Sequence, residues 1–221
     1  MPRMTGTTRY ESATGERAGT LAAEPDTGFW LRAGVPGSPA TPRSVVAAET
    51  TARSISSYEP LVIPGLLQSA AYARELFRCS LFTPEQQEVR VAYRLSRQEL
   101  LHKSGRPHAE FFVHERALRN MVGDSRVMQE QSMHLFLAAA HGECVVRVVP
   151  RAVRSFAVMD SFSLYEYPAQ PSAIYAESMS GGVFVDEPHQ VALYRKVLER
   201  LRDRALSPEV TRTLLARLAD A

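Results

Sequence analysis

The chain has 221 residues, of which 45% are hydrophobic and 23% are charged, so it can bury a sizeable core without metals or disulfides. No apolar run approaches the length that a transmembrane helix needs, and the first residues lack the continuous apolar segment of a secretory signal. Two cysteines are too few for a disulfide framework or a cysteine zinc cage. We therefore expect a cytoplasmic protein with no membrane partner.

The charge pattern argues against a nucleic-acid partner. The chain has 26 basic and 24 acidic residues, a net charge of +2, and the basic residues are scattered along it. A surface that binds nucleic acid needs them clustered on one face. We therefore expect no direct contact with DNA or RNA.

Residues 1–43 predict a flexible, irregular leader. Residues 33–42 contain three prolines and two glycines, which prevent a helix or a central strand from crossing this stretch. Trp30 is the exception in a polar segment, and two interpretations are open. It is a foot packed on the main body, or a lid over a pocket that binds a ligand or partner.

The next segments predict helices. Residues 44–55 contain no helix breaker and predict a first helix that ends before Tyr58. After a turn at Pro64 and Gly65, residues 66–77 have apolar positions at helical spacing. Thr83 can cap a helix that continues to about Lys103, with proline in its first turn and Gln86 completing a capping box.

The second half alternates between strands and helices. Strands are predicted over 109–115, 144–150, 161–168 and 172–178, and helices over 116–123, 125–141, 188–206 and from Ser207 onward. Gly181 and Gly182 predict a turn. The pattern favours an α+β fold over 44–221, with a small, largely antiparallel sheet flanked by helices.

Standard catalytic signatures are absent, including phosphate-binding glycine loops and zinc-binding HExxH helices. His102, His108 and His114 recur every six residues but fall in different elements, so we expect no metal site and no cofactor. Cys144 opens an apolar strand and is expected to be a small buried hydrophobe. Cys79 lies near a helix end beside a basic residue, but no histidine is placed to act as its base.

Three polar clusters are candidates for a functional site. Arg94, Arg97 and Gln98 share one helical face, which could clamp an anionic group or brace the domain. Tyr165 lies in one predicted strand, and Tyr175 and Glu177 share a face of the next. These side chains could form the floor of a ligand pocket or a partner surface.

Glu115 is the third candidate. It ends a hydrophobic strand, where burial would raise the pKa of its carboxyl group as acid–base catalysis requires. It could equally cap the helix that follows.

Several segments resemble the effector domain of actinobacterial Xre-type regulators, which are described as antitoxin-like transcriptional regulators. The resemblance covers roughly residues 44–219, and its proline-glycine-leucine-leucine-glutamine and arginine-glutamine elements are fairly specific. The segments that carry it are YEPLVIPGLLQSAAYAREL at 58–76, RLSRQELL at 94–101, HERALRNMVGDSRVMQEQSMHL at 114–135, VRVVP at 146–150 and SAIYAESMSGGVFVDEP at 172–188.

Two departures from that family affect what the resemblance implies. In the family this domain normally follows a helix-turn-helix, whereas only 43 residues without helical periodicity precede the matching region here. Residues 151–160 also lack the glycine-histidine turn that the family has after the preceding strand. A changed loop at a strand end is a place where new specificity can arise.

Two hypotheses follow. The first is a stand-alone domain that senses a small molecule or binds a protein partner, with homodimerisation plausible. The second is a cofactor-independent cyclase or isomerase of secondary metabolism that uses a shaped apolar pocket. In the second, Glu115 and Tyr175 are the candidate catalytic residues, and Arg94 and Tyr165 the candidate anchors.

Overall fold

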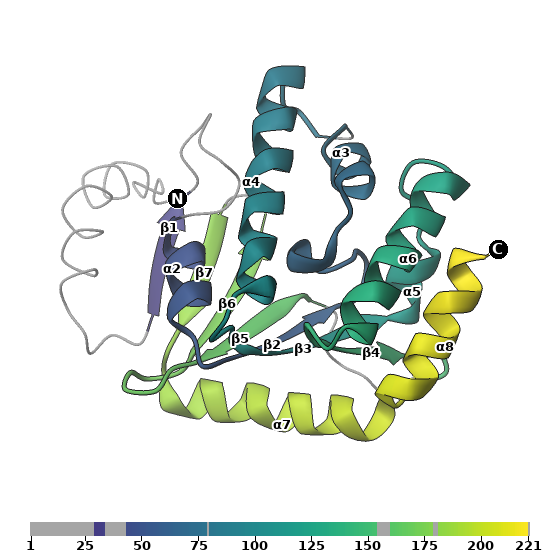
Figure 1. Ribbon diagram of the computed structural model, residues 1–221. Helices are drawn as coiled ribbons and strands as arrows, with labels where there is room; N and C mark the ends of the chain where they lie inside the picture. The colour runs from purple at the N-terminus through teal and green to yellow at the C-terminus, as the bar shows by residue number, and fades with distance from the viewer. Residues whose placement is uncertain (1–28, 34–42, 79, 154–159, 179–180, 221) are drawn as a thin grey trace, which may run out of the picture.

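The computed structural model describes residues 29–33, 43–78, 80–153, 160–178 and 181–220 (Figure 1). The strands are β1 (Phe29–Ala33), β2 (Ser54–Glu59), β3 (His108–His114), β4 (Val145–Val149), β5 (Phe162–Glu166), β6 (Ala173–Ser178) and β7 (Gly181–Val185). The helices are α2 (Arg43–Thr51), α3 (Ala70–Arg78), α4 (Pro84–His102), α5 (Glu115–Arg119), α6 (Ser125–Ala140), α7 (Pro188–Arg204) and α8 (Pro208–Ala219), and a 3-10 turn spans Gly65–Leu67. This is the α+β fold that the sequence predicts.

These strands form one mixed sheet in the order β1-β7-β6-β5-β2-β3-β4. The strands β2, β3 and β4 run parallel to one another, whereas the pairs from β2 through β5, β6 and β7 to β1 are antiparallel. The expectation of a largely antiparallel sheet is therefore wrong for the part formed by β2, β3 and β4. The two parallel pairs are joined by connections that contain helices, as parallel neighbours require.

Strand β2 was not predicted, which accounts for one of the two parallel pairs; the other, β3 with β4, joins two strands that were predicted. The helix expected over 44–55 ends at Thr51, and β2 then runs through the middle of the sheet. Its sequence SISSYE contains buried serines at 56 and 57, so it lacks the apolar run that marks a central strand. Thr50 and Thr51 donate hydroxyl hydrogen bonds back to helix carbonyls, which is common where a helix is ending.

The predicted turn at the two glycines is also wrong, because they open strand β7. A side chain at position 182 would clash with a neighbouring residue. A Cβ atom on it would lie 2.2 Å from Cε2 of Tyr175, so glycine makes room for the tyrosine ring. Close approach of another group is a usual reason for glycine inside a strand.

The predicted leader contains strand β1, which pairs with β7 and places Trp30 opposite Phe184. The described backbone puts Trp30 at one edge of the sheet. Its side chain and residues 1–28 and 34–42 lie outside the described part. The foot and the lid interpretations of Trp30 therefore both stay predictions.

Helices cover both faces of the sheet (Figure 1). Of the described helices, α7 is the one that lies across one face, where Val191, Leu198 and Leu201 pack on a buried apolar layer. The other helices stand on the opposite face and enclose the larger core. No helix in the described ranges has the length and apolarity needed to cross a bilayer.

The predicted helix starts are confirmed. Thr83 and Gln86 form the reciprocal capping box of α4, and Pro84 occupies the first turn. Asp124 caps α6 and Ser207 caps α8, each accepting a hydrogen bond from a backbone amide three residues on. These side chains satisfy amides that the first turn of a helix leaves free.

Helix α8 closes the sheet at β4. The amide of Val148 donates to Oγ1 of Thr211 over 3.1 Å, and the carbonyl of Val148 accepts from the amide of Leu206 over 2.8 Å. Thr211 is fully buried. The edge groups at Val148 are therefore satisfied within the chain, which blocks pairing with another strand at that point.

We predict that Thr211→Val lowers the free energy of unfolding by about 1–3 kcal/mol, because it leaves a buried amide without an acceptor at nearly unchanged volume. Thr213→Val is the matched control, since Thr213 is exposed on the same helix. Urea denaturation of both variants measures the difference. Equal midpoints for the two variants would contradict this account of the edge.

Candidate functional site

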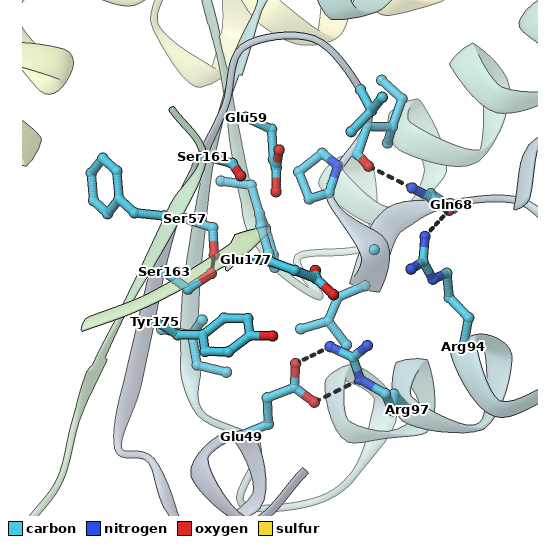
Figure 2. A pocket seen from close by; sticks show the side chains of 18 of the residues that line it. Glu49, Ser57, Glu59, Gln68, Arg94, Arg97, Ser161, Ser163, Tyr175 and Glu177 are labelled. Carbon is cyan, nitrogen blue, oxygen red and sulfur yellow. Dashed lines mark hydrogen bonds and ion pairs between the residues drawn. The ribbon is translucent and has the colours of Figure 1, made fainter. Parts of the chain in front are cut away.

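A cavity of about 420 Å³ lies between the sheet and the helices on the face opposite α7 (Figure 2). Strands β2, β5 and β6 provide its floor. Helix α4, the end of α3 and the loop that precedes α3 provide its roof and walls. Charged and aromatic side chains line it beside apolar ones such as Ile55, Leu66 and Phe111.

The floor consists of cross-strand rows on three neighbouring strands. Ile55 pairs with Tyr165, which pairs with Ala173. One step along the same face, Ser57 pairs with Ser163, which pairs with Tyr175. Because side chains on one face recur every two residues, the next row begins with Glu59 on β2 and Glu177 on β6. Along β2, the side chains of the floor therefore change from the apolar Ile55 to the hydroxyl of Ser57 and then to the carboxylate of Glu59.

The roof is a buried loop, and side chains satisfy its backbone. The Gln68 amide donates to the carbonyl of Ile63 over 2.7 Å, and the Gln98 amide donates to the carbonyl of Gln68 over 2.6 Å. Gln131 of α6 accepts from the amide of Ser69 and donates to the carbonyl of Leu67, both over 2.7 Å. Such bonds are needed because a buried loop has no water for its polar groups.

Two arginines of α4 face the cavity with different surroundings (Figure 2). Arg97 forms a bidentate ion pair with Glu49 of α2, and Glu49 is 3% exposed. Arg94 donates to Oε1 of Gln68 over 2.7 Å, and its guanidinium carbon lies 4.7 Å from the centre of the Phe77 ring. Among the described residues, no carboxylate oxygen lies within 4.0 Å of the Arg94 guanidinium.

The pKa of Arg94 is lowered and the pKa of Arg97 is raised, because the two side chains have different partners. Burial, and then the positive charge of Arg97, lower the pKa of Arg94. Glu177 and Glu59 oppose this effect from a distance. Burial alone would lower the pKa of Arg97, but the hydrogen bonds and charge of Glu49 raise it overall. Arg97 is therefore a neutralised structural pair, while Arg94 has donors for a further acceptor.

The carboxylates at the end of the floor have raised pKa values. Burial and the nearby charge of Glu177 raise the pKa of Glu59 to about 8, although Arg94 opposes the shift. Burial also raises the pKa of Glu177, which keeps contact with solvent in the cavity. Within the described residues, neither side chain forms a hydrogen bond or an ion pair.

The hydroxyl of Tyr175 is buried in the wall of the same cavity. The residue is 7% exposed, and its hydroxyl oxygen has no hydrogen-bond partner in the described part of the chain. Burial raises the pKa of Tyr175 well above its usual value, so the group stays a neutral donor. Figure 2 shows this hydroxyl turned toward the space that Glu177 and Arg97 border.

Five of the residues selected from the sequence line this one cavity: Arg94, Arg97, Tyr165, Tyr175 and Glu177. Gln98 does not line it, because its amide reaches the carbonyls of Gly65 and Gln68 and braces the roof. Both interpretations of the α4 face are thus represented, with Arg94 turned to the cavity and Gln98 bracing the loop.

Glu115 differs from its prediction. Hydrogen bonds from the amide of Arg151 and the side chain of Arg119 lower the pKa of Glu115, whereas a raised value was expected. The cap of α5 is His114, whose Nδ1 accepts from the amide of Arg116, so the capping interpretation is also wrong. Glu115 also does not line the cavity.

The residues that sequence reasoning missed come mainly from β2. Ser57 and Glu59 have the two-residue spacing of a strand face, so they would have been selected had β2 been recognised. Gln68 lies in the resemblance motif, but only the structure shows what it bonds. Nothing in the sequence connects Glu49 with Arg97, which lies 48 positions further on.

No described cysteine or histidine lines the cavity. Cys144 is buried as expected, and burial raises the pKa of its thiol to about 12. Cys79 lies outside the described residues. Across the described ranges, no three histidine, cysteine, aspartate or glutamate side chains are grouped to hold a metal ion.

We predict that Arg97→Gln lowers the free energy of unfolding by about 3–5 kcal/mol, because it leaves the Glu49 carboxylate buried without its partner. Arg74→Gln is the control. Arg74 pairs with Glu88 on the surface, where both side chains are about half exposed, so its loss should barely move the midpoint. Chemical denaturation measures both variants, and equal small effects would contradict a structural role for Arg97.

Comparisons with known proteins complete the description of the site. No curated protein matches the chain. A structure of an archaeal chromatin protein, TrmBL2, described as showing a novel mode of DNA binding, is similar at 10% identity and a TM-score of 0.40. That match covers 91% of this chain and 63% of the other. Residues 42–217 match the family described as "Domain of unknown function (DUF5753)", and the chain belongs to that family.

Proposed function

We propose that the chain is a small-molecule-binding domain and that the cavity over β2, β5 and β6 is its ligand site. The observation that carries the proposal is the unpartnered hydroxyl of Tyr175, buried in the cavity wall. A buried polar group without a partner costs about 1–3 kcal/mol. A ligand that accepts from or donates to this hydroxyl would remove that cost.

The other unpaired groups support the same proposal. Arg94 has donors left after its bond to Gln68, and Glu59 and Glu177 provide acceptors across the cavity. The volume of about 420 Å³ falls in the range of small-molecule sites, which combine apolar walls with a few polar groups. The expected ligand therefore has a mass of a few hundred daltons.

A sensing role fits the way in which the roof is held. Arg94 bonds to Gln68, whose own amide holds the buried loop. A ligand acceptor that draws Arg94 toward the cavity would change that contact, and with it the position of the loop against α4. This role agrees with the resemblance to regulator effector domains, in which the domain would report the presence of a ligand.

An enzyme is the second candidate, and Glu59 rather than Glu115 favours it. A carboxyl group with a pKa of about 8 in a cavity can hold and transfer a proton near neutral pH. In this case the cavity would bind a substrate, and Tyr175 would orient it. Conversion of the bound molecule with time would distinguish an enzyme from a sensor.

We predict that Tyr175→Phe leaves the stability of the free protein unchanged or slightly raised, because it removes an unsatisfied hydroxyl. The same variant should lose most of its ligand. Tyr72→Phe is the contrasting control, since the Tyr72 hydroxyl accepts from the amide of Ile63 over 3.3 Å. It should lower the melting temperature.

Native mass spectrometry of the untagged protein, incubated in a metabolite extract of its source cells, supplies the ligand measurement. We expect a mass increment of a few hundred daltons on the wild type that is strongly reduced on Tyr175→Phe. An increment that survives this substitution, or no increment on the wild type, would overturn the assignment of the cavity. A second mass that grows with time would favour the enzyme.

A further inference from the structure

A second hollow adjoins the cavity at the end of the sheet. It is a groove of about 880 Å³ between α7 and the ends of β2 and β6, and Leu61, Leu193, Tyr194 and Val197 are among its lining. Leu61 is 56% exposed and Leu193 is 55% exposed. The groove therefore presents apolar side chains to solvent rather than to the core, which is a usual mark of a binding surface.

The groove and the cavity meet at two carboxylates. Glu59, Ser161 and Glu177 line both hollows. The pairing of Tyr58 with Phe162 and of Ser163 with Tyr175, continued along these strands, places Ser161 between Glu59 and Glu177. Since adjacent strands lie about 4.8 Å apart, the two carboxylates flank a passage about two strand spacings wide.

Among the described residues, no cation forms an ion pair with either carboxylate, and Arg94 and Arg97 act on them only from a distance. Two carboxylates that share a site repel each other unless a positive charge or a proton compensates them. Arg94 is the nearest candidate, but in the described residues it makes no ion pair with either one. Figure 2 shows Glu59 and Glu177 turned toward the same space, with the Tyr175 hydroxyl beyond them.

We infer that the ligand carries a cationic amine, which lies between Glu59 and Glu177, and an apolar body that lies in the groove against α7. This inference rests on the proposed function and names its ligand class. An ammonium group has three donors and would reach the two carboxylates and the Tyr175 hydroxyl or Ser161. The apolar body would cover Leu61 and Leu193, whereas an anionic ligand would meet the carboxylate of Glu177 at the passage.

The test uses chain-matched probes and isothermal titration calorimetry. Octylammonium is expected to bind the wild type at least about tenfold more tightly than 1-octanol or octanoate, a factor that corresponds to a single ionic contact of modest strength. Glu177→Gln should remove this preference. Glu199→Gln is the control, because Glu199 is an exposed carboxylate on the adjoining helix α7.

A groove variant separates the two parts of the inference. Leu193→Ser should weaken octylammonium by about threefold to tenfold, in proportion to the apolar contact it removes, and should not weaken propylammonium. Octylammonium binding no tighter than octanol, or unchanged in Glu177→Gln, overturns the amine assignment. If octanoate binds instead, or if no probe binds, that assignment also fails, while the extract experiment still decides whether the cavity is a ligand site.

The inference also predicts a pH dependence. Glu59, with a pKa of about 8, holds a proton in most free molecules at pH 7, and it is faced by Glu177 of β6, Arg94 of α4, Tyr72 of α3 and Asp160 at the groove. A bound ammonium lowers this pKa, so binding releases a proton. Octylammonium affinity should therefore rise between pH 6 and pH 8, by at most about fiftyfold if the bound form is fully deprotonated.

Calorimetry in two buffers with different ionisation enthalpies at pH 7 measures how many protons are released for each ligand bound. A fractional release is expected for the wild type and none for Glu59→Gln, whose affinity should not vary with pH over this range. Proton uptake on binding, or equal release by the two proteins, would contradict the placement of the amine beside Glu59.

Discussion

The site depends on one constraint, which is that the backbone groups of a buried loop must all find hydrogen-bond partners. Residues 63, 64 and 66–69 are buried, yet the only regular element among them is one short 3-10 turn. Their backbone must therefore find partners from side chains. Three glutamines, Gln68, Gln98 and Gln131, provide most of them. Because Gln68 and Gln98 also tie this loop to α4, the same bonds position the helix that carries the two cavity arginines.

The charged groups around the cavity are compensated on one side and not on the other. At one side the charges are compensated, since Arg97 and Glu49 form a buried pair. At the end of the strands they are not compensated, because Glu59 and Glu177 have no ion-pair partner among the described residues. Among the described residues, the carboxylates of Glu59 and Glu177 and the hydroxyl of Tyr175 thus lie without partners on one side of this cavity. This asymmetry distinguishes a binding site from a packing defect, which would be apolar or filled by its own side chains.

The predictable parts of this protein are those with a local cause. Thr83 and Gln86 begin α4 by a contact three residues apart, and period-two spacing places Tyr175 and Glu177 on one face. Strand β2 has no such local mark, because its serines are buried by tertiary pairing, with Ser57 bonded to Ser163 over 2.7 Å. Missing β2 hid Glu59 and the parallel pairing of β2 with β3 together. Glu115 failed differently, since its neighbour Arg151 arrives from another part of the chain.

A site with unpaired groups lowers the stability of the fold that contains it, so the rest of the structure must offset that cost. The layer under α7 does so with apolar packing around Phe112, Ile174 and Leu201, beside the buried Glu110, which pairs with Arg147 and Arg202. Large aliphatic and aromatic side chains buried in this way stabilise by about 1.5–3 kcal/mol each, so several of them together exceed the cost of one unsatisfied hydroxyl. The cavity with its unpaired groups thus lies on one face of the sheet, and the apolar layer under α7 lies on the other. The cavity and the groove share Glu59, Ser161 and Glu177 in their linings, so a ligand that spans them would contact both layers at once.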